Sequence, residues 1–133
     1  MKPFHLESSM KTMGGVFYPT GYMVLMFPGE EGARDAAKLL ADNGIEDDVT
    51  MITPADFRRE ILETQGDEAI LPSAGTESDT VRRFAELSAQ GGHALMIHAP
   101  HGKDSDRVTE LLKGCEISYG QKYRMLVIED IVD

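Results

Sequence analysis

The chain has no tryptophan and a single cysteine, Cys115, among its 133 residues. One cysteine cannot form a disulfide within the chain, which suits the reducing cytoplasm. Long apolar segments are also missing, because the longest run, Tyr22–Phe27, is far shorter than the roughly 20 residues of a membrane-spanning helix. No apolar stretch typical of a secretory signal precedes that run. We therefore expect a cytoplasmic protein.

Basic residues are scarce, with 13 lysines and arginines against 23 aspartates and glutamates, for a formal net charge of −10. Such a surface repels the phosphates of nucleic acids and of anionic membranes, so we expect neither as a partner. Hydrophobic residues at 41% and charged residues at 27% are typical of a globular domain. We assign residues 1–15, which show no periodicity, to a flexible N-terminal arm, and residues 16–133 to a single α/β domain.

The first half of that domain predicts a strand, a helix and a second strand. Tyr22–Phe27 is a short apolar run that ends at a Pro-Gly pair, which favours a strand. Glu30–Asn43 predicts a helix, because three alanines and a leucine recur at the i, i+3, i+4 and i+7 spacing. Gly44 suits the left-handed residue that ends many helices, and Val49–Ile52 is the second strand.

The middle of the chain, residues 53–92, predicts two helices. Thr53 has the properties of a helix cap, with a proline next and an aspartate at the third helical position. Phe57 and Ile61 share one face of the helix that follows. A further helix is expected at Ser78–Gln90, where a pair of glycines ends the pattern.

The last part of the chain completes the pattern. His93–Ala99 is a third apolar strand, and Asp104 or Ser105 is expected to cap a fourth helix. A short connection then leads to a last strand, Tyr123–Glu129. The predicted order is β-α-β-α-α-β-α-β.

Two architectures accept that order. One is a ferredoxin-like α/β sandwich, with two crossover helices on one face of the sheet and residues 53–92 as a helical insertion between strands 2 and 3. The other is a small doubly wound parallel sheet. Four strands make a small sheet for the second architecture, so the helix-rich insertion favours the first.

The first strand is apolar on both of its faces, which requires cover on both sides of the sheet. Its alternating residues are Met23, Leu25 and Phe27 on one face, and Tyr22, Val24 and Met26 on the other. A sheet with one solvated face would alternate apolar with polar residues. Either the helices at 54–64 and 78–90 cover the second face or a second subunit does, and we predict a homodimer.

Two segments resemble known bacterial proteins. The first consists of the strand Gly21–Phe27, an alanine-rich helix with Leu40, the pair Gly44-Ile45 and the strand Val49–Ile52. It resembles the repeating βαβ unit of small bacterial general-stress (heat-induced stress) proteins. The resemblance implies a ferredoxin-like fold and a stress-associated role, with no catalytic residues to carry over. The second segment, Gln121–Asp130, is similar to the tail of uncharacterised bacterial proteins of similar size.

Polar residues gather where the third strand ends and the fourth helix begins, namely His98, His101, Lys103 and Asp104. Ligands often bind near the carboxyl ends of strands in α/β sheets, so these four residues are our predicted ligand-binding site. His98 and His101 have the spacing of a first pair of metal ligands, but the sequence places no third ligand. An ordinary polar turn before a helix explains the same residues. We predict no catalytic residue, no metal and no cofactor.

Other groups in the sequence favour structural interpretations. Cys115 lies on the apolar stripe of the fourth helix, which is typical of a small buried residue. The strand-to-helix turn Pro28–Gly32 lacks the spacing of a phosphate-binding loop. We predict a non-enzymatic, stress-associated or regulatory domain that acts by self-association or by binding a partner. The alternative is a small-molecule or metal-binding domain, or an enzyme, with its site near His98 and His101.

Overall fold

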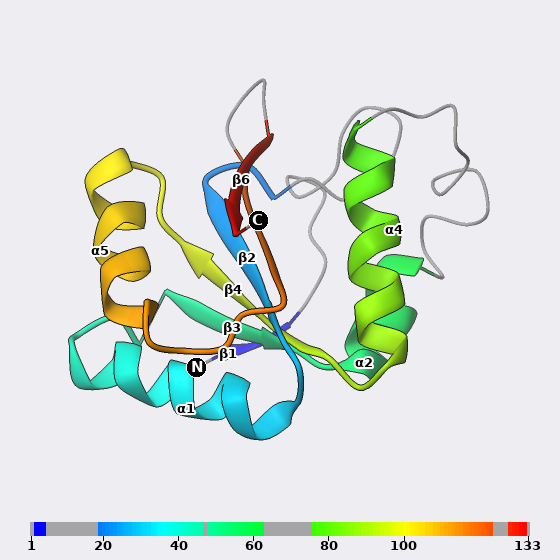
Figure 1. The fold of residues 1–133 in the computed structure, drawn as a ribbon, viewed down its shortest axis with the longest axis horizontal. Coiled ribbons are helices and arrows are strands. Elements are labelled where there is room, and N and C mark those ends of the chain that lie inside the picture. Colours follow the sequence, from blue (N-terminus) through cyan, green and yellow to red (C-terminus); the bar gives the residue numbers. More distant parts are fainter. Residues whose placement is uncertain (1, 5–18, 47, 63–75, 124–127, 133) are drawn as a thin grey trace.

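Figure 1 shows the protein in a computed structural model that describes residues 2–4, 19–46, 48–62, 76–123 and 128–132. The strands in these residues are β1 (Lys2–Pro3), β2 (Tyr22–Phe27), β3 (Val49–Ile52), β4 (His93–His98), β5 (Tyr119–Tyr123) and β6 (Ile128–Val132). The helices are α1 (Glu30–Asp42), α2 (Pro54–Asp56), the π-helical segment η2 (Phe57–Leu62), α4 (Thr76–Ala89) and α5 (Gly102–Leu112). The protein is therefore an α/β protein, as its sequence predicts.

Local signals in the sequence set the ends of several elements. Gly44 has a φ of +83° just past α1, in the left-handed region that favours glycine. Thr53 and Asp56 form a capping box at α2, in which the hydroxyl of Thr53 accepts from the Asp56 amide at 3.1 Å and the Asp56 carboxylate accepts from the Thr53 amide at 3.3 Å. The π-helical η2 was not expected, yet Phe57 and Ile61, which were predicted to share one face, are both buried in one core.

The predicted last strand, Tyr123–Glu129, is wrong in its bounds. The structure has β5 before it and β6 at its end, while residues 124–127 lie outside the described residues. Gly120, Gln121 and Lys122 lack an apolar pattern and were expected in a connection, but they are buried in β5. The reason is tertiary, because β5 pairs with β2 on one side and with β6 on the other.

The start of the chain is tied to the sheet. β1 pairs in parallel with β3, and Lys2 lies opposite Thr50. Phe4 is 3% exposed and belongs to the core beside α4. Residues 2–4 of the predicted arm therefore pair with the sheet and pack on it. Residues 5–18 of that arm lie outside the described residues.

The strands form one sheet in the order β1-β3-β4-β2-β5-β6. Its central pairs β3·β4, β4·β2 and β2·β5 are all antiparallel, which excludes the doubly wound parallel alternative. The insertion predicted at residues 53–92 is present between β3 and β4 and contains α2, η2 and α4. Figure 1 shows α1 and α5 on one side of the sheet and α2 and α4 on the other.

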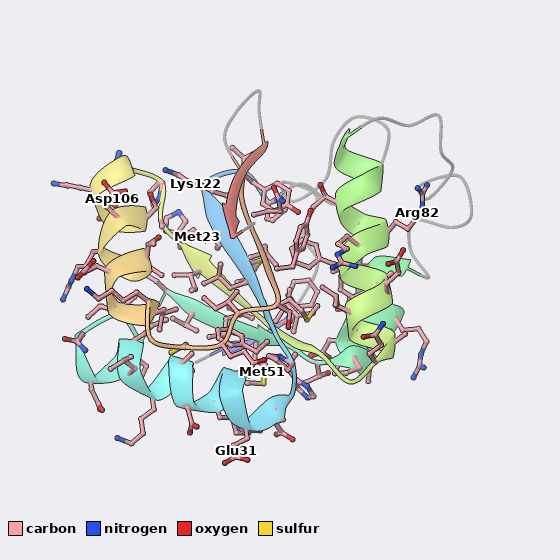
Figure 2. The ribbon with its side chains drawn as sticks, in the orientation of Figure 1. Met23, Glu31, Met51, Arg82, Asp106 and Lys122 are labelled. Carbon is pink, nitrogen blue, oxygen red and sulfur yellow. The ribbon has the colours of Figure 1, made fainter. Side chains whose placement is uncertain are left out.

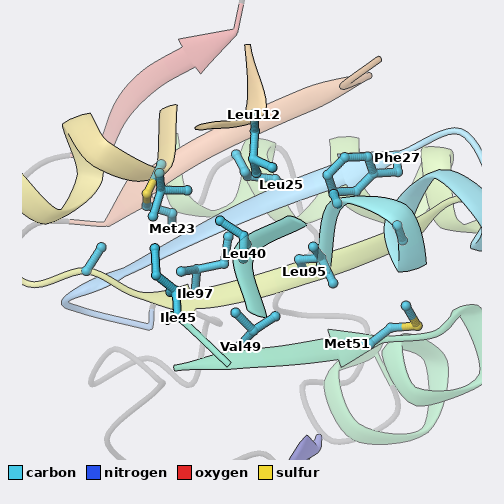
Figure 3. Close-up of a cluster of buried hydrophobic side chains, with 14 residues drawn as sticks. Met23, Leu25, Phe27, Leu40, Ile45, Val49, Met51, Leu95, Ile97 and Leu112 are labelled. Atoms are coloured by element: carbon cyan, nitrogen blue, oxygen red, sulfur yellow. The ribbon is translucent and has the colours of Figure 1, made fainter. Parts of the chain in front are cut away.

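One core, here called the α1–α5 core, lies between the sheet and the helices α1 and α5. Met23, Leu25 and Phe27 from β2 point into it, and Leu40 and Leu112 reach it from the two helices (Figure 3). Each of these five side chains is at most 1% exposed. Burying a side chain of this size contributes about 1.5–3 kcal/mol, so this core fixes both helices on the sheet.

A second core, here called the α4 core, covers the opposite face. Val24 and Met26 of β2 pack there with Phe57 of η2 and Phe84 of α4. The predicted cover on both faces is therefore confirmed, and helices of the same chain supply it. This removes the reason for which a second subunit was expected, and the homodimer stays a prediction. Figure 2 shows the contrast between inward-pointing Met23 and the outward-pointing Arg82 on α4.

Candidate functional site

The four predicted site residues lie where β4 passes into α5. His98 is the last residue of β4, His101 is the residue before α5, and Lys103 and Asp104 are in its first turn. Asp104 is partly buried, whereas the other three are exposed. The structure therefore places all four on one connection. His98 and Asp104 line one pocket, whereas His101 and Lys103 lie outside its lining.

Backbone pairing and a ring contact position His98. Its amide donates to the carbonyl of Asp48 at 2.9 Å, which places the end of β4 beside the turn that precedes β3. Its ring lies 4.8 Å from the ring of Tyr22, centroid to centroid, at an angle of 50°. Tyr22 is directly opposite His98 in the β2·β4 register. Gly21, with a φ of +85°, turns the chain just before this pair.

The start of α5 differs from the expected cap. His101 occupies the cap position in extended conformation, with no hydrogen bond from its side chain, so neither Asp104 nor Ser105 is the cap. Ser105 is 3% exposed, and its hydroxyl donates to the carbonyl of Gly102 at 3.0 Å. The Ser105 hydroxyl therefore bonds to a carbonyl three residues earlier instead of capping the helix. Asp104 instead lies where the helix dipole favours an anion.

A pocket of about 280 Å³ lies where the end of β4, the first turns of α5 and the turn after α1 meet. It is lined by Gly44, Ile45, Asp48, His98, Pro100, Asp104, Arg107 and Val108. His98 and Asp104 therefore share one pocket. His101 and Lys103 do not belong to its lining, because they face solvent at the start of α5.

Arg107 is held at the pocket by a long-range contact. Its guanidinium donates to the carbonyl of Asn43 at 2.6 Å, across 64 positions of sequence. Asn43 ends α1, where the carbonyl ends of a helix favour a cation. The contact joins α5 to the end of α1 and brings a positive charge to the same pocket as Asp48 and Asp104.

Two charged residues of the pocket, Asp48 and Arg107, were missed by the sequence prediction. Arg107 lies three positions after Asp104, which places both on one face of a helix, so this spacing was an available signal. Asp48 gave no such signal, because only the pairing of β3 with β4 brings it to His98.

Of two other pockets, one has an apolar base and the other is lined by several carboxylates. A pocket of about 260 Å³ between β2 and α5 has an apolar base that includes Met23, Leu25 and Leu112. A larger one, about 420 Å³ beside the start of α1, carries the carboxylates of Glu31, Asp35 and Glu116. Cys115 touches both of them. It lies beyond the end of α5 and not on its stripe, and it packs partly buried against the α1–α5 core.

The described residues contain no group of three or more histidine, cysteine, aspartate or glutamate side chains arranged to hold a metal ion. None of the helices in this part of the chain is long and apolar enough to cross a membrane. A scan against protein-family models and searches of curated proteins and of solved structures found nothing that this chain matches. Any functional assignment must therefore come from the pocket itself.

Proposed function

We propose that this protein is a non-enzymatic regulatory domain that binds a small polar molecule in the pocket between β4, α5 and the turn after α1. The observation that carries the proposal is the convergence of His98, Asp48, Asp104 and Arg107 on one pocket from three separate parts of the chain. Charged side chains are usually spread over a protein surface. Their convergence on a hollow is typical of a ligand site.

The size and chemistry of the pocket support binding of a small ligand. Its volume of about 280 Å³ lies just below the range of roughly 300–1,000 Å³ that is common for drug-sized ligands. No serine, threonine, cysteine or lysine side chain lines it in the part of the chain that the structure describes. The lining therefore offers histidine and aspartate, which can bind a ligand or take part in acid–base chemistry, and no hydroxyl, thiol or amine nucleophile among these residues.

We further propose that the fold is a ferredoxin-like sandwich. The order β5-β2-β4-β3 of its four central strands, all antiparallel, supports this assignment. So does the placement of α1 and α5 over one face, since these helices are the two crossovers expected of such a sandwich. The stress-associated role has no support beyond the resemblance in sequence and stays a prediction.

A thermal-shift screen of small polar metabolites tests the proposed function. A ligand that binds only the folded protein stabilises it by about 2.7 kcal/mol when its concentration is 100 times the dissociation constant. We expect at least one compound to raise the melting temperature of the wild type and to have little effect on His98→Gln or Arg107→Gln. Arg58→Gln is the matched control, because Arg58 is exposed on η2, outside the lining of this pocket.

Two results would refute the proposed function. One is a screen in which no compound raises the melting temperature. The other is a stabilising compound whose effect is as large in both pocket variants as in the Arg58→Gln control.

A further inference from the structure

Several basic side chains on or next to the described helices have a carboxylate partner three or four residues away. These ion pairs join Arg34 to Glu30 at 2.6 Å, Lys38 to Asp42 at 3.0 Å, Arg59 to Asp56 at 2.7 Å, and Lys113 to Glu110 at 2.8 Å. The spacing brings the two charges together on one helical face. Ion pairs at this spacing therefore recur on the helices of this protein.

Arg107, in the candidate pocket, makes no such pair with its described neighbours. It follows Asp104 by three positions, the same spacing as in two of those pairs. Within the described residues, however, no ion pair joins Arg107 to Asp104 or to Asp48. The guanidinium donates instead to the backbone carbonyl of Asn43 at 2.6 Å. The pocket therefore contains a cation and two carboxylates that form no ion pair with one another.

Each of these charges suits a different end of one ligand. Arginine has five N–H donors in a planar fork, so the donor engaged by Asn43 leaves others that match a carboxylate. The carboxylates of Asp48 and Asp104 only accept hydrogen bonds, which suits an ammonium group with its three donors. Ile45, Pro100 and Val108 add apolar lining that a short aliphatic chain would contact.

We propose that the ligand of this pocket is a small zwitterion, in which a carboxylate binds Arg107 and an ammonium group binds Asp104 and Asp48. This inference rests on the proposed function and narrows it to one chemical class. A ligand with a single charge would satisfy one side of the pocket and leave the other side without a partner from the ligand. Selectivity for the doubly charged molecule is the direct consequence.

Isothermal titration calorimetry with probes of matched length tests this selectivity. The zwitterions are 2-aminobutanoate and 4-aminobutanoate, which differ in the separation of their charges. The singly charged probes are butanoate and butylamine, and butanol is the neutral probe. At pH 7 we expect one of the zwitterions to bind the full-length protein at least tenfold more tightly than any of the other three probes.

Charge-neutralising variants assign each end of the ligand. Arg107→Gln should lower the affinity for the zwitterion to that for butylamine. Asp104→Asn should lower it part of the way towards that for butanoate, because Asp48 still faces the ammonium group. Asp106→Asn is the matched control, because Asp106 is exposed on the same helix and lies outside the pocket lining, and it should leave the affinity unchanged. Asp48→Asn provides a second acidic variant if Asp104→Asn does not fold.

The outcomes separate this inference from the proposed function. If butanoate, butylamine or butanol binds as tightly as both zwitterions, or if neither zwitterion binds, the inference is overturned. It is also overturned if Asp104→Asn and Asp48→Asn both bind the zwitterion like the wild type. In each case the proposed function still stands if the metabolite screen yields a compound whose effect depends on His98 or Arg107. The proposed function is refuted as well if the screen yields no such compound.

Discussion

Replacing Gly92 with alanine tests how closely the end of α4 approaches the sheet. Gly92 joins α4 to β4, and its amide donates to the carbonyl of Leu87 at 3.0 Å. A Cβ atom at this position would lie 2.7 Å from the Met26 sulfur and 2.8 Å from the Leu87 carbonyl oxygen. Both distances are shorter than real Cβ contacts, so the substitution forces the chain to shift.

The cost of that shift follows from the identity of the two neighbours. Met26 has a flexible side chain, but it is 1% exposed and has little space in which to move. The Leu87 oxygen is backbone at the end of α4 and moves only if the helix end moves. Overpacking of this kind costs about 1–3 kcal/mol. For a domain of this size each kcal/mol lowers the melting temperature by about 2–8 °C.

Gly32→Ala is the matched control in urea and thermal unfolding. Gly32 lies inside α1, and a Cβ there would meet only the Cβ of Phe27 at an ordinary 3.9 Å. Alanine favours a helix over glycine by about 0.5–1 kcal/mol, so this variant should be more stable than the wild type. The reasoning is refuted if Gly92→Ala unfolds at the same urea concentration as the wild type, because α4 then does not approach β2 as closely as described.

Two further predictions concern the same insertion. Phe84→Ala should lower the free energy of unfolding by about 3–5 kcal/mol in urea titrations, because Phe84 is 0% exposed in the α4 core. A loss below about 1 kcal/mol would show that this core is not tightly packed. Leu39→Ala, at a side chain that is 36% exposed on α1, is the control and should change that energy by less than about 0.5 kcal/mol. Thr53→Ala should lower the free energy of unfolding by about 0.5–2 kcal/mol in the same assay, because it removes one hydrogen bond of the capping box. An unchanged free energy of unfolding would contradict the capping role of Thr53.

The sequence was most informative where burial imposes a period. β2 is apolar on both faces, and that pattern alone predicted that both faces of the sheet are covered. It failed at β5, where Gly120, Gln121 and Lys122 have neither an apolar run nor an alternation. Pairing with strands on both sides makes β5 a strand, and pairing between distant segments leaves no local pattern in the sequence.

The candidate site was predictable in part for the same reason. His98 and Asp104 were found because they flank a strand end and a helix start that are visible in the sequence. Asp48 and Arg107 come to the pocket through β-strand pairing and through the contact between Arg107 and Asn43, neither of which is local. His101 and Lys103 were assigned to the site by their position in sequence, although their side chains lie outside the pocket.

The most direct measurement is a map of amide chemical shifts in two-dimensional ¹H–¹⁵N NMR during titration with a compound that stabilises the protein. Binding in the proposed pocket predicts that the largest changes fall on the turn from Gly44 to Asp48, on His98 and on the first two turns of α5. Amides of α4, on the other face of the sheet, should hardly change. Largest changes at α4, or at the apolar pocket around Leu25 and Ile117, would contradict the assignment of the site.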